Sequence, residues 1–301
     1  MKTFTFILTY LLFTTINYAQ EVDWKYYGQT TPDTIPELFM PDQINHLAHS
    51  SPTFSPNGKE IYWSIVGANK QTRKIYCVSF ENNKWSEPKI ASFSGKHHDD
   101  QPFISYDGEK LFFASKRPKT TKGEEINDIW ISKKVNDEWS EPKPIDNLVG
   151  FWTPTLTKDE TVYFLELFDQ NRMICFSKLK DGKYSSVECL NENINAEGSI
   201  NWCPFIAPDE SYIIFSSNRM GGYGNGDLYI SFRNENGNWG KAINMGSAIN
   251  TDKQERFPGV SPDGKYLFFT RWNSSPYYHD LYWISSKIIQ DLRNQVLKMD
   301  Y

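Results

Sequence analysis

The chain has 301 residues, of which 16% are aromatic and 23% are charged. This composition excludes an intrinsically disordered chain, because it supplies enough apolar surface for a packed core. The 37 acidic and 32 basic residues give a net charge of −5 and are mixed along the sequence. We therefore expect neither nucleic acid nor an anionic membrane surface as the partner.

The N-terminus has the pattern of a cleaved secretory signal peptide. Lys2 is followed by an apolar run from Phe4 to Ile16 and then by a small residue, Ala19. The run is too short for a membrane-spanning helix, and no later segment is apolar enough for one. We expect residues 1–19 to be removed and residues 20–301 to form a single periplasmic or secreted domain. A short buried helix is the alternative for the N-terminal run.

Four cysteines in a secreted chain permit disulfides but do not require them. Cys175 and Cys189 flank a predicted hairpin turn at residues 181–182. A two-residue turn would place Cys175 opposite Glu188, whereas a three-residue loop would place it opposite Cys189, and the sequence does not distinguish the two. The default interpretation is a small buried apolar side chain for each cysteine: Cys77, Cys175, Cys189 and Cys203.

One unit of about 50 residues is repeated five times. Its leading prolines are Pro52, Pro102, Pro154, Pro204 and Pro258. An apolar residue follows each proline by two positions, an Asn or Asp by five, and an apolar triplet by nine to eleven. Each copy therefore predicts a strand, a tight turn and a second strand covered on both faces. Glu160 and Glu210 replace glycine in the turns of the third and fourth copies, which disfavours a primed two-residue turn there.

Each period continues with two shorter strands, and four strands in about 50 residues are typical of a β-propeller blade. The fifth copy lacks a fourth strand and ends in a helical pattern, KIIQDLRNQVLKM. The segment from Glu37 to Ile44 has the spacing from Pro52 that an outer strand would have, so we expect it to complete the last blade. The predicted fold class is all-β: a β-propeller of five four-stranded blades, closed by an N-terminal strand and followed by a short C-terminal helix.

The SPDGK-type hairpins and the stretch SSNRMGGYGNGDLYISFRNENGNWG resemble the WD40-like β-propeller repeats of the TolB-like family. The resemblance extends from about Pro36 to Ile289. It implies a bacterial periplasmic or secreted protein, and propellers of this superfamily mostly serve as protein-binding platforms, while relatives such as oligogalacturonate lyases are enzymes. The chain departs from TolB itself, because it leaves no room for a separate N-terminal α/β domain and has five repeats in place of six blades. A role in envelope transport is therefore not implied.

Two sets of loops should meet on one face of the predicted disc: the segments before the prolines and those between the second and third strands. Loops from all blades converge there at the mouth of the central channel, where we expect the ligand site. Arginine can clamp a carboxylate and an indole can stack on a sugar face. The candidate ligand-binding residues are His49, His97, His98, Asp99, Asp100, Arg117, Trp152, Trp202, Arg219, Glu255, Arg256, Arg271 and Trp272. Lys116, Glu166, Asn201 and Asn218 lie in the same segments.

A structural role is the alternative for each of these residues. The tryptophans can fill gaps between blades. The arginines can form ion pairs inside the blades, where Arg117, Arg219 and Arg271 have the candidate partners Asp128, Asp227 and Asp280.

The range His97–Asp100 is the densest set of potential metal ligands. Because alternate residues of a strand share a face, one histidine and one aspartate of this range can face one ion. His49 or Glu255 would have to supply a third ligand. The sequence requires no cofactor, and a divalent metal such as calcium remains a candidate.

The sequence favours a binding module over an enzyme. It contains no GxSxG, HExxH, P-loop or dinucleotide-binding motif. A paired-carboxylate glycosidase site could use Asp100, Glu166 and Glu255. We expect a module that presents its loop face to an envelope or extracellular protein or to a glycan. The alternative is a carbohydrate-active enzyme, a polysaccharide lyase or glycoside hydrolase, with its site at the channel mouth.

Overall fold

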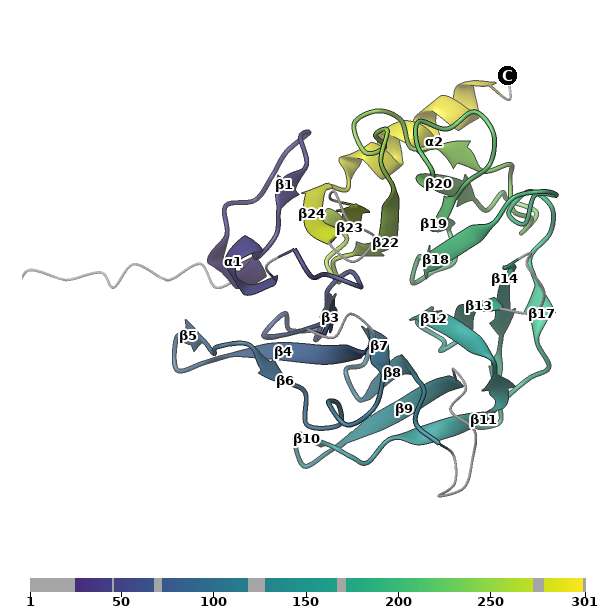
Figure 1. Cartoon of the computed structure of the whole chain (residues 1–301). Coiled ribbons are helices and arrows are strands. Elements are labelled where there is room, and N and C mark those ends of the chain that lie inside the picture. Colours follow the sequence, from purple (N-terminus) through teal and green to yellow (C-terminus); the bar gives the residue numbers. More distant parts are fainter. Residues whose placement is uncertain are drawn as a thin grey trace, which may run out of the picture.

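Five β-sheets surround a central axis in the computed structural model of the chain (Figure 1). It describes residues 25–44, 46–67, 72–118, 128–166, 172–272 and 279–299. The predicted signal peptide, residues 1–19, lies outside the described residues. Within the described ranges, no helix combines the length and apolar character needed to cross a membrane.

Each of these five sheets is one antiparallel blade whose first three strands pair in sequence order outward from the axis. The first blade contains β2 (Thr53–Phe54), β3 (Glu60–Val66), β4 (Arg73–Glu81), β5 (Lys84–Trp85) and β6 (Lys89–Ile90). The second contains β7 (Asp99–Ile104), β8 (Lys110–Ser115), β9 (Asp128–Val135), β10 (Glu138–Trp139) and β11 (Lys143–Val149). The third contains β12 (Phe151–Leu156), β13 (Val162–Glu166), β14 (Ile174–Ser177) and β17 (Glu188–Cys189), with a small hairpin of β15 (Leu179–Lys180) and β16 (Lys183–Tyr184).

The last two blades follow the same plan. The fourth contains β18 (Asn201–Ile206), β19 (Tyr212–Ser217), β20 (Asp227–Phe232) and β21 (Ile243–Asn244). The fifth contains β22 (Glu255–Val260), β23 (Tyr266–Trp272), β24 (His279–Ser285) and β1 (Glu37–Leu38). The helical elements are η1 (Lys25–Gly28), α1 (Pro41–Ile44) and α2 (Lys287–Met299). The predicted five-bladed propeller with a C-terminal helix is confirmed.

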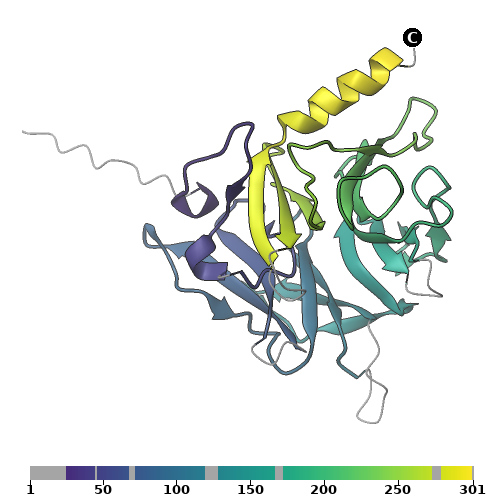
Figure 2. The ribbon, with the colours of Figure 1, turned by 45° about the horizontal axis from the view of Figure 1, so that its top comes forward.

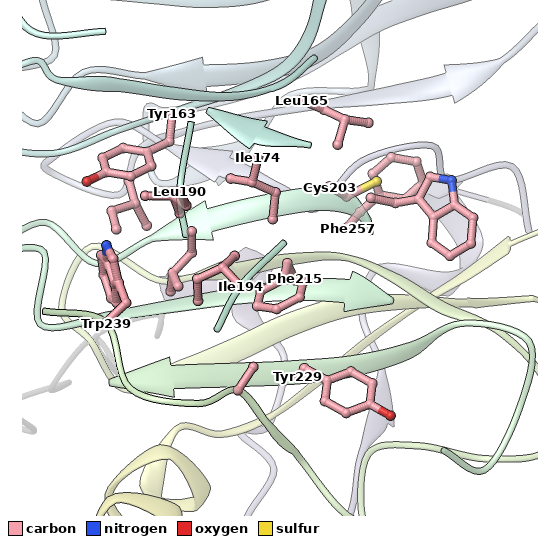
Figure 3. Close-up of a cluster of buried hydrophobic side chains, with 14 residues drawn as sticks. Tyr163, Leu165, Ile174, Leu190, Ile194, Cys203, Phe215, Tyr229, Trp239 and Phe257 are labelled. Carbon is pink, nitrogen blue, oxygen red and sulfur yellow. The ribbon is translucent and has the colours of Figure 1, made fainter. Parts of the chain in front are cut away.

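Apolar cores lie between neighbouring blades, as the continuous apolar triplets predict. In β3, Trp63 packs toward the fifth blade, whereas the adjacent Tyr62 packs toward the second. In the described part of the chain there are five such clusters, one for each junction of the ring. Figure 3 shows the core between the third and fourth blades, with Tyr163 and Trp239 at one end and Cys203 at the other. Burial on both faces of every middle strand thus stabilises the closed ring.

The ring is closed by the N-terminal segment, which lies beside β24 in Figure 2. Glu37 of β1 pairs with Trp283, and the amide of Phe39 donates to the carbonyl of Leu281 over 2.8 Å. The predicted outer strand is confirmed for β1, but α1 replaces its second half. Proline has no amide for a strand ladder and fits the first turn of a helix, which explains why pairing stops before Pro41.

The five inner hairpins share one turn. Glu160 and Glu210 have φ values of 61° and 58°, in the same left-handed region as Gly58, whose φ is 72°. The preceding residues, Asp159 and Asp209, do not have positive φ, so these two blades have no primed two-residue turn, as expected, and the glycine-containing blades share the same turn. A left-handed glutamate is strained, and side-chain contacts offset this cost: Glu160 accepts from Nζ of Lys110 over 2.6 Å.

Cys175 and Cys189 form a disulfide, so the default interpretation is wrong for them. The turn at residues 181–182 has two residues, because Lys180 pairs with Lys183. The register then shifts by one residue, which places Cys175 opposite Cys189. The remaining two cysteines, Cys77 and Cys203, are buried free thiols, as expected.

Candidate functional site

The inner strand of each blade runs from the face that carries the segments before the prolines, the pre-proline face, to the face that carries the inner hairpins, the hairpin face. In four blades the ladder between the first two strands shifts register at the proline. The residue directly before that proline has a positive φ in each case: Gln101 (53°), Thr153 (55°), Cys203 (48°) and Phe257 (49°). Such bulges redirect side chains. With Ser51, these residues surround the channel and form what we call the pre-proline ring.

In the second, fourth and fifth blades, the residue three positions before the proline turns into its own blade. In the second blade, Nη2 of Arg117 lies 2.7 Å from Oδ1 of Asp99 and donates to the carbonyl of Phe93 over 2.9 Å. The guanidinium also lies over the Phe113 and Trp130 rings, with centroids 5.0 and 5.3 Å away. Arg117 and Asp99 are both buried. They tie the blade together and lie outside the channel mouth.

The same arrangement recurs in two further blades. Arg219 donates to the carbonyl of Ile194 and to Asn201, over 2.7 and 3.4 Å. Nε of Arg271 donates to Glu255 over 2.8 Å. The structural alternative thus describes these arginines, although their partners come from the inner strand and not from the predicted aspartates of the third strand.

The residue two positions before the proline points to the other side of its strand, because successive side chains of a strand alternate. These residues form what we call the mouth ring: Ser50, Asp100, Trp152, Trp202 and Arg256. Four of them are predicted site residues.

Asp100 is the fully buried centre of this mouth. Ser64 donates to its Oδ1 over 2.6 Å, and Nδ1 of His49 lies 2.9 Å from its Oδ2. Nε of Arg73 lies 3.3 Å from the same oxygen, as an ion pair without hydrogen-bond alignment. Burial by itself would raise the pKa of Asp100, but His49, Arg73 and Ser64 outweigh it, so this pKa lies below its ordinary value.

His49 has the opposite electrostatic balance. Burial lowers its pKa below the ordinary value, even though the Asp100 carboxylate acts to raise it, and the positive charges of Arg73 and Arg256 contribute to the lowering. Its ring lies 4.8 Å from that of Phe257, between centroids. His49 is thus held neutral at neutral pH.

Arg256 lies over Trp202, with its guanidinium carbon 4.6 Å from the ring centroid. Arg172 lies 5.9 Å from the same ring, and Arg73 lies 6.0 Å from the ring of Trp152. Burial lowers the pKa of Arg256, and the positive charge of Arg172 adds to this effect. Among the described residues, no carboxylate lies within ion-pair distance of Arg256.

Several buried donors at the mouth have no hydrogen-bond partner in the described structure. They are Nε of Arg73, Nε of Arg256, and Nε1 of Trp152 and of Trp202. Nε1 of Trp63, Trp130 and Trp283 is likewise unpaired inside the blade cores, so the two guanidinium donors are what distinguish the mouth as a place where a ligand could supply acceptors. The mouth therefore suits an anionic ligand with an apolar face.

The other predicted site residues are distributed around this centre. Nε2 of His98 lies 3.0 Å from Nη1 of Arg73, which brings His98 to the mouth. His97 is half-buried in the loop before β7. Trp272 donates through Nε1 to His279. Glu166 lies beside the disulfide, with Oε2 3.3 Å from Sγ of Cys189.

The geometry does not assemble the predicted metal site. In the described part of the chain, the group of three or more ligands close enough for one ion consists of Glu166, Cys175 and Cys189, whose two sulfur atoms are joined to each other. Glu255 is engaged by Arg271 and by the hydroxyl of Thr251, over 2.8 and 2.7 Å.

Three basic residues near the mouth were not among the predicted site residues: Arg73, Arg172 and His279. Each lies two positions before the first residue of an apolar run in the third strand of its blade. The runs are IYC in the first blade, ICF in the third and LYW in the fifth. This periodic basic position was the signal that could have found them.

The fold and its mouth define a β-propeller in which arginines lie against two tryptophans at one end of the channel. No protein-family model matches the chain, and no curated protein sequence matches it. Solved structures do. A putative TolB from Agrobacterium tumefaciens superimposes with a TM-score of 0.52 at 17% identity, covering 76% of this chain and 71% of that one.

TolB from Acinetobacter baumannii gives a TM-score of 0.50 at 16% identity, covering 78% of this chain and 56% of that one. An endo-arabinase from Bacteroides thetaiotaomicron gives 0.52 at 14% identity, covering 80% and 95%. The resemblance to TolB-like propellers is thereby confirmed at the level of the fold. At these identities the likeness establishes the fold alone.

Proposed function

We propose that the protein is a periplasmic or secreted binding module whose channel mouth binds a carboxylate-bearing glycan. The observation that carries this proposal is Arg256, which lies over Trp202 without a carboxylate partner among the described residues. A uronate residue offers the complementary groups, since its carboxylate can pair with the Arg256 guanidinium while its sugar face stacks on Trp152, the less buried of the two indoles.

The charge balance of the mouth supports an acidic ligand over a neutral one. Arg73, Arg172 and Arg256 approach the two tryptophans, whereas Asp100 is already engaged by His49 and Arg73. A bound carboxylate would relieve the repulsion between Arg172 and Arg256. A neutral glycan would leave these charges uncompensated.

The proposed compartment is supported by two features. The first 19 residues have the signal-peptide pattern. The disulfide between Cys175 and Cys189 is of a kind that persists in oxidising compartments outside the cytoplasm.

A lyase acting on the same ligand is the second candidate, and His49 favours it. A neutral imidazole beside arginines that hold a carboxylate is suited to remove the proton on the carbon next to that carboxylate. A paired-carboxylate hydrolase is less well supported, because Glu255 is held inside its blade by Arg271.

Calorimetric titration with a uronic-acid oligosaccharide tests the proposal, with a neutral oligosaccharide of equal length as the reference. We expect the acidic ligand to bind and Arg256→Met to weaken it by roughly tenfold or more. Arg293→Met is the matched control, because Arg293 lies on α2 and donates to the carbonyl of Ser211 near an inner hairpin.

Equal binding of the acidic and neutral ligands, or full affinity in Arg256→Met, would exclude the proposed mode. Turnover is followed separately through the absorbance of the unsaturated product. Formation of this product by the wild type but not by His49→Gln would identify a lyase. Binding without any product would identify a binding module.

A further inference from the structure

A chamber of about 240 Å³ lies in the channel between the pre-proline ring and the hairpin face. Two further layers form its wall: the five repeat prolines, and then Thr53, Phe103, Thr155, Phe205 and Gly259. It ends at the hairpin face beside Tyr106 and Lys158. The chamber borders the mouth ring at Ser50, and the rest of its wall lies at or beyond the pre-proline ring, toward the hairpin face.

The wall is mostly apolar, and two of its threonine hydroxyl groups are engaged in joining the blades. Thr53 Oγ1 accepts from the amide of Ile104 over 3.0 Å, and Thr155 Oγ1 accepts from the amide of Ile206 over 3.3 Å. Gly259 keeps the backbones close, since a Cβ there would lie 2.5 Å from Oγ of Ser51. The chamber thus follows from the way in which the inner strands pack.

Two aromatic rings that contact each other form part of the chamber wall. Phe103 and Phe205 belong to the second and fourth blades, and their centroids lie 6.5 Å apart at an interplanar angle of 42°. An apolar cavity of about 150 Å³ is large enough for benzene. The larger chamber therefore has room for one substituted aromatic ring, which can pack against both phenylalanines.

The two ends of the chamber carry different polar groups. Gln101 is 8% exposed, and its Oε1 is buried without a hydrogen-bond partner. Lys158 is exposed at the outer end, where the first and fifth blades have Pro56 and Pro262. No carboxylate of the described residues lies within ion-pair distance of Lys158.

We infer that the chamber is a second binding site, for a small aromatic acid that carries a ring hydroxyl. The hydroxyl pairs with the Gln101 amide, the ring packs against Phe103 and Phe205 from one side, and the carboxylate reaches Lys158. A hydroxyl suits this position because it both donates and accepts, whichever way the amide is oriented. A buried amide left unpaired would disfavour a ligand without the hydroxyl.

Calorimetric titration of the purified protein with 4-hydroxyphenylacetate tests this inference. We expect binding of one molecule per chain, and affinities roughly tenfold lower for phenylacetate, which lacks the hydroxyl, and for 2-(4-hydroxyphenyl)ethanol, which lacks the carboxylate. Lys158→Met should lower the affinity for the acid to that for the alcohol. Lys180→Met, at another exposed lysine, should leave it unchanged.

Gln101→Leu should bind 4-hydroxyphenylacetate and phenylacetate with equal affinity. If Gln101→Leu does not fold, Lys158→Met still tests the inference. Failure of all three probes to bind would overturn the inference. It would also be overturned by unchanged affinity in Lys158→Met, or by loss of binding in Arg256→Met alone, which would place the probe in the mouth. Glycan binding at the mouth is independent of each of these results.

Discussion

Nδ1 of His49 lies 2.9 Å from Oδ2 of Asp100, and both side chains belong to the pre-proline face of the channel. The contact joins the first blade to the second. It leaves Asp100 ionised and His49 neutral at neutral pH, because burial disfavours the imidazolium while three neighbours stabilise the carboxylate.

This pair makes stability depend on pH. The folded pKa of His49 lies below its ordinary value of 6.5, so the unfolded chain binds more protons, and the free energy of unfolding falls as the pH drops below 6.5. Asp100 acts in the same direction, but only near and below its ordinary pKa of 3.8. Thermal unfolding between pH 7.5 and 5 should show a decline that is smaller in His49→Gln. An identical decline in both proteins would contradict the assignment.

Arg256 should lower the stability of the unliganded protein. Its buried Nε is unpaired and it faces Arg172, so Arg256→Met removes a desolvated like-charge contact and should raise the free energy of unfolding by about 1 kcal/mol. Denaturant unfolding without ligand measures this. A destabilised Arg256→Met protein would instead identify Arg256 as a structural residue.

Arg117 should behave in the opposite way. Arg117→Met leaves the buried Asp99 carboxylate without its cation and should cost about 3–5 kcal/mol. Adding Asp99→Asn should recover part of this loss, as a double-mutant cycle would measure. Ligand affinity at the mouth should be unchanged in any variant that folds, and a specific loss of affinity would place Arg117 in the site.

Closure of the ring should depend on Phe39. Its side chain is 1% exposed and contacts the rings of Phe54, Phe268 and Trp283. Phe39→Ala should therefore lower the free energy of unfolding by about 3–5 kcal/mol. Leu38→Ala, at an exposed neighbour in β1, should cost less than about 1 kcal/mol. Similar losses in both variants would argue against a closing core at Phe39.

The disulfide should contribute through its effect on the unfolded chain. Cys175 and Cys189 are 14 residues apart, and a loop of about this length corresponds to a stabilisation of about 3 kcal/mol. The double variant Cys175→Ser/Cys189→Ser should lose that amount in denaturant unfolding. Thiol titration of the unreduced protein should find two free thiols after unfolding and none before. Burial explains the second result, since it raises the pKa of Cys77 to about 11 and that of Cys203 to about 12.

The architecture was readable from the sequence because the repeat is local. Proline, turn residue and apolar triplet recur at fixed offsets within about fifteen residues, and each offset encodes one hairpin. Even the closing segment at Glu37 could be placed, since its distance from Pro52 repeats the spacing of the other blades. The shared left-handed turn at Glu160 was missed because glutamate carries no local signal for a positive φ.

The division of polar residues between the mouth and the blades was decided by the tertiary structure alone. Asp99 and Asp100 are neighbours in sequence, yet Asp99 pairs with Arg117 inside a blade while Asp100 meets His49 and Arg73 from the adjacent blade. The bulge at the following proline and the packing of neighbouring blades determine which face each side chain takes. Sequence periodicity thus determined that five blades form, whereas contacts between blades, which join residues distant in sequence such as His49 and Asp100, determined which residues meet at the mouth.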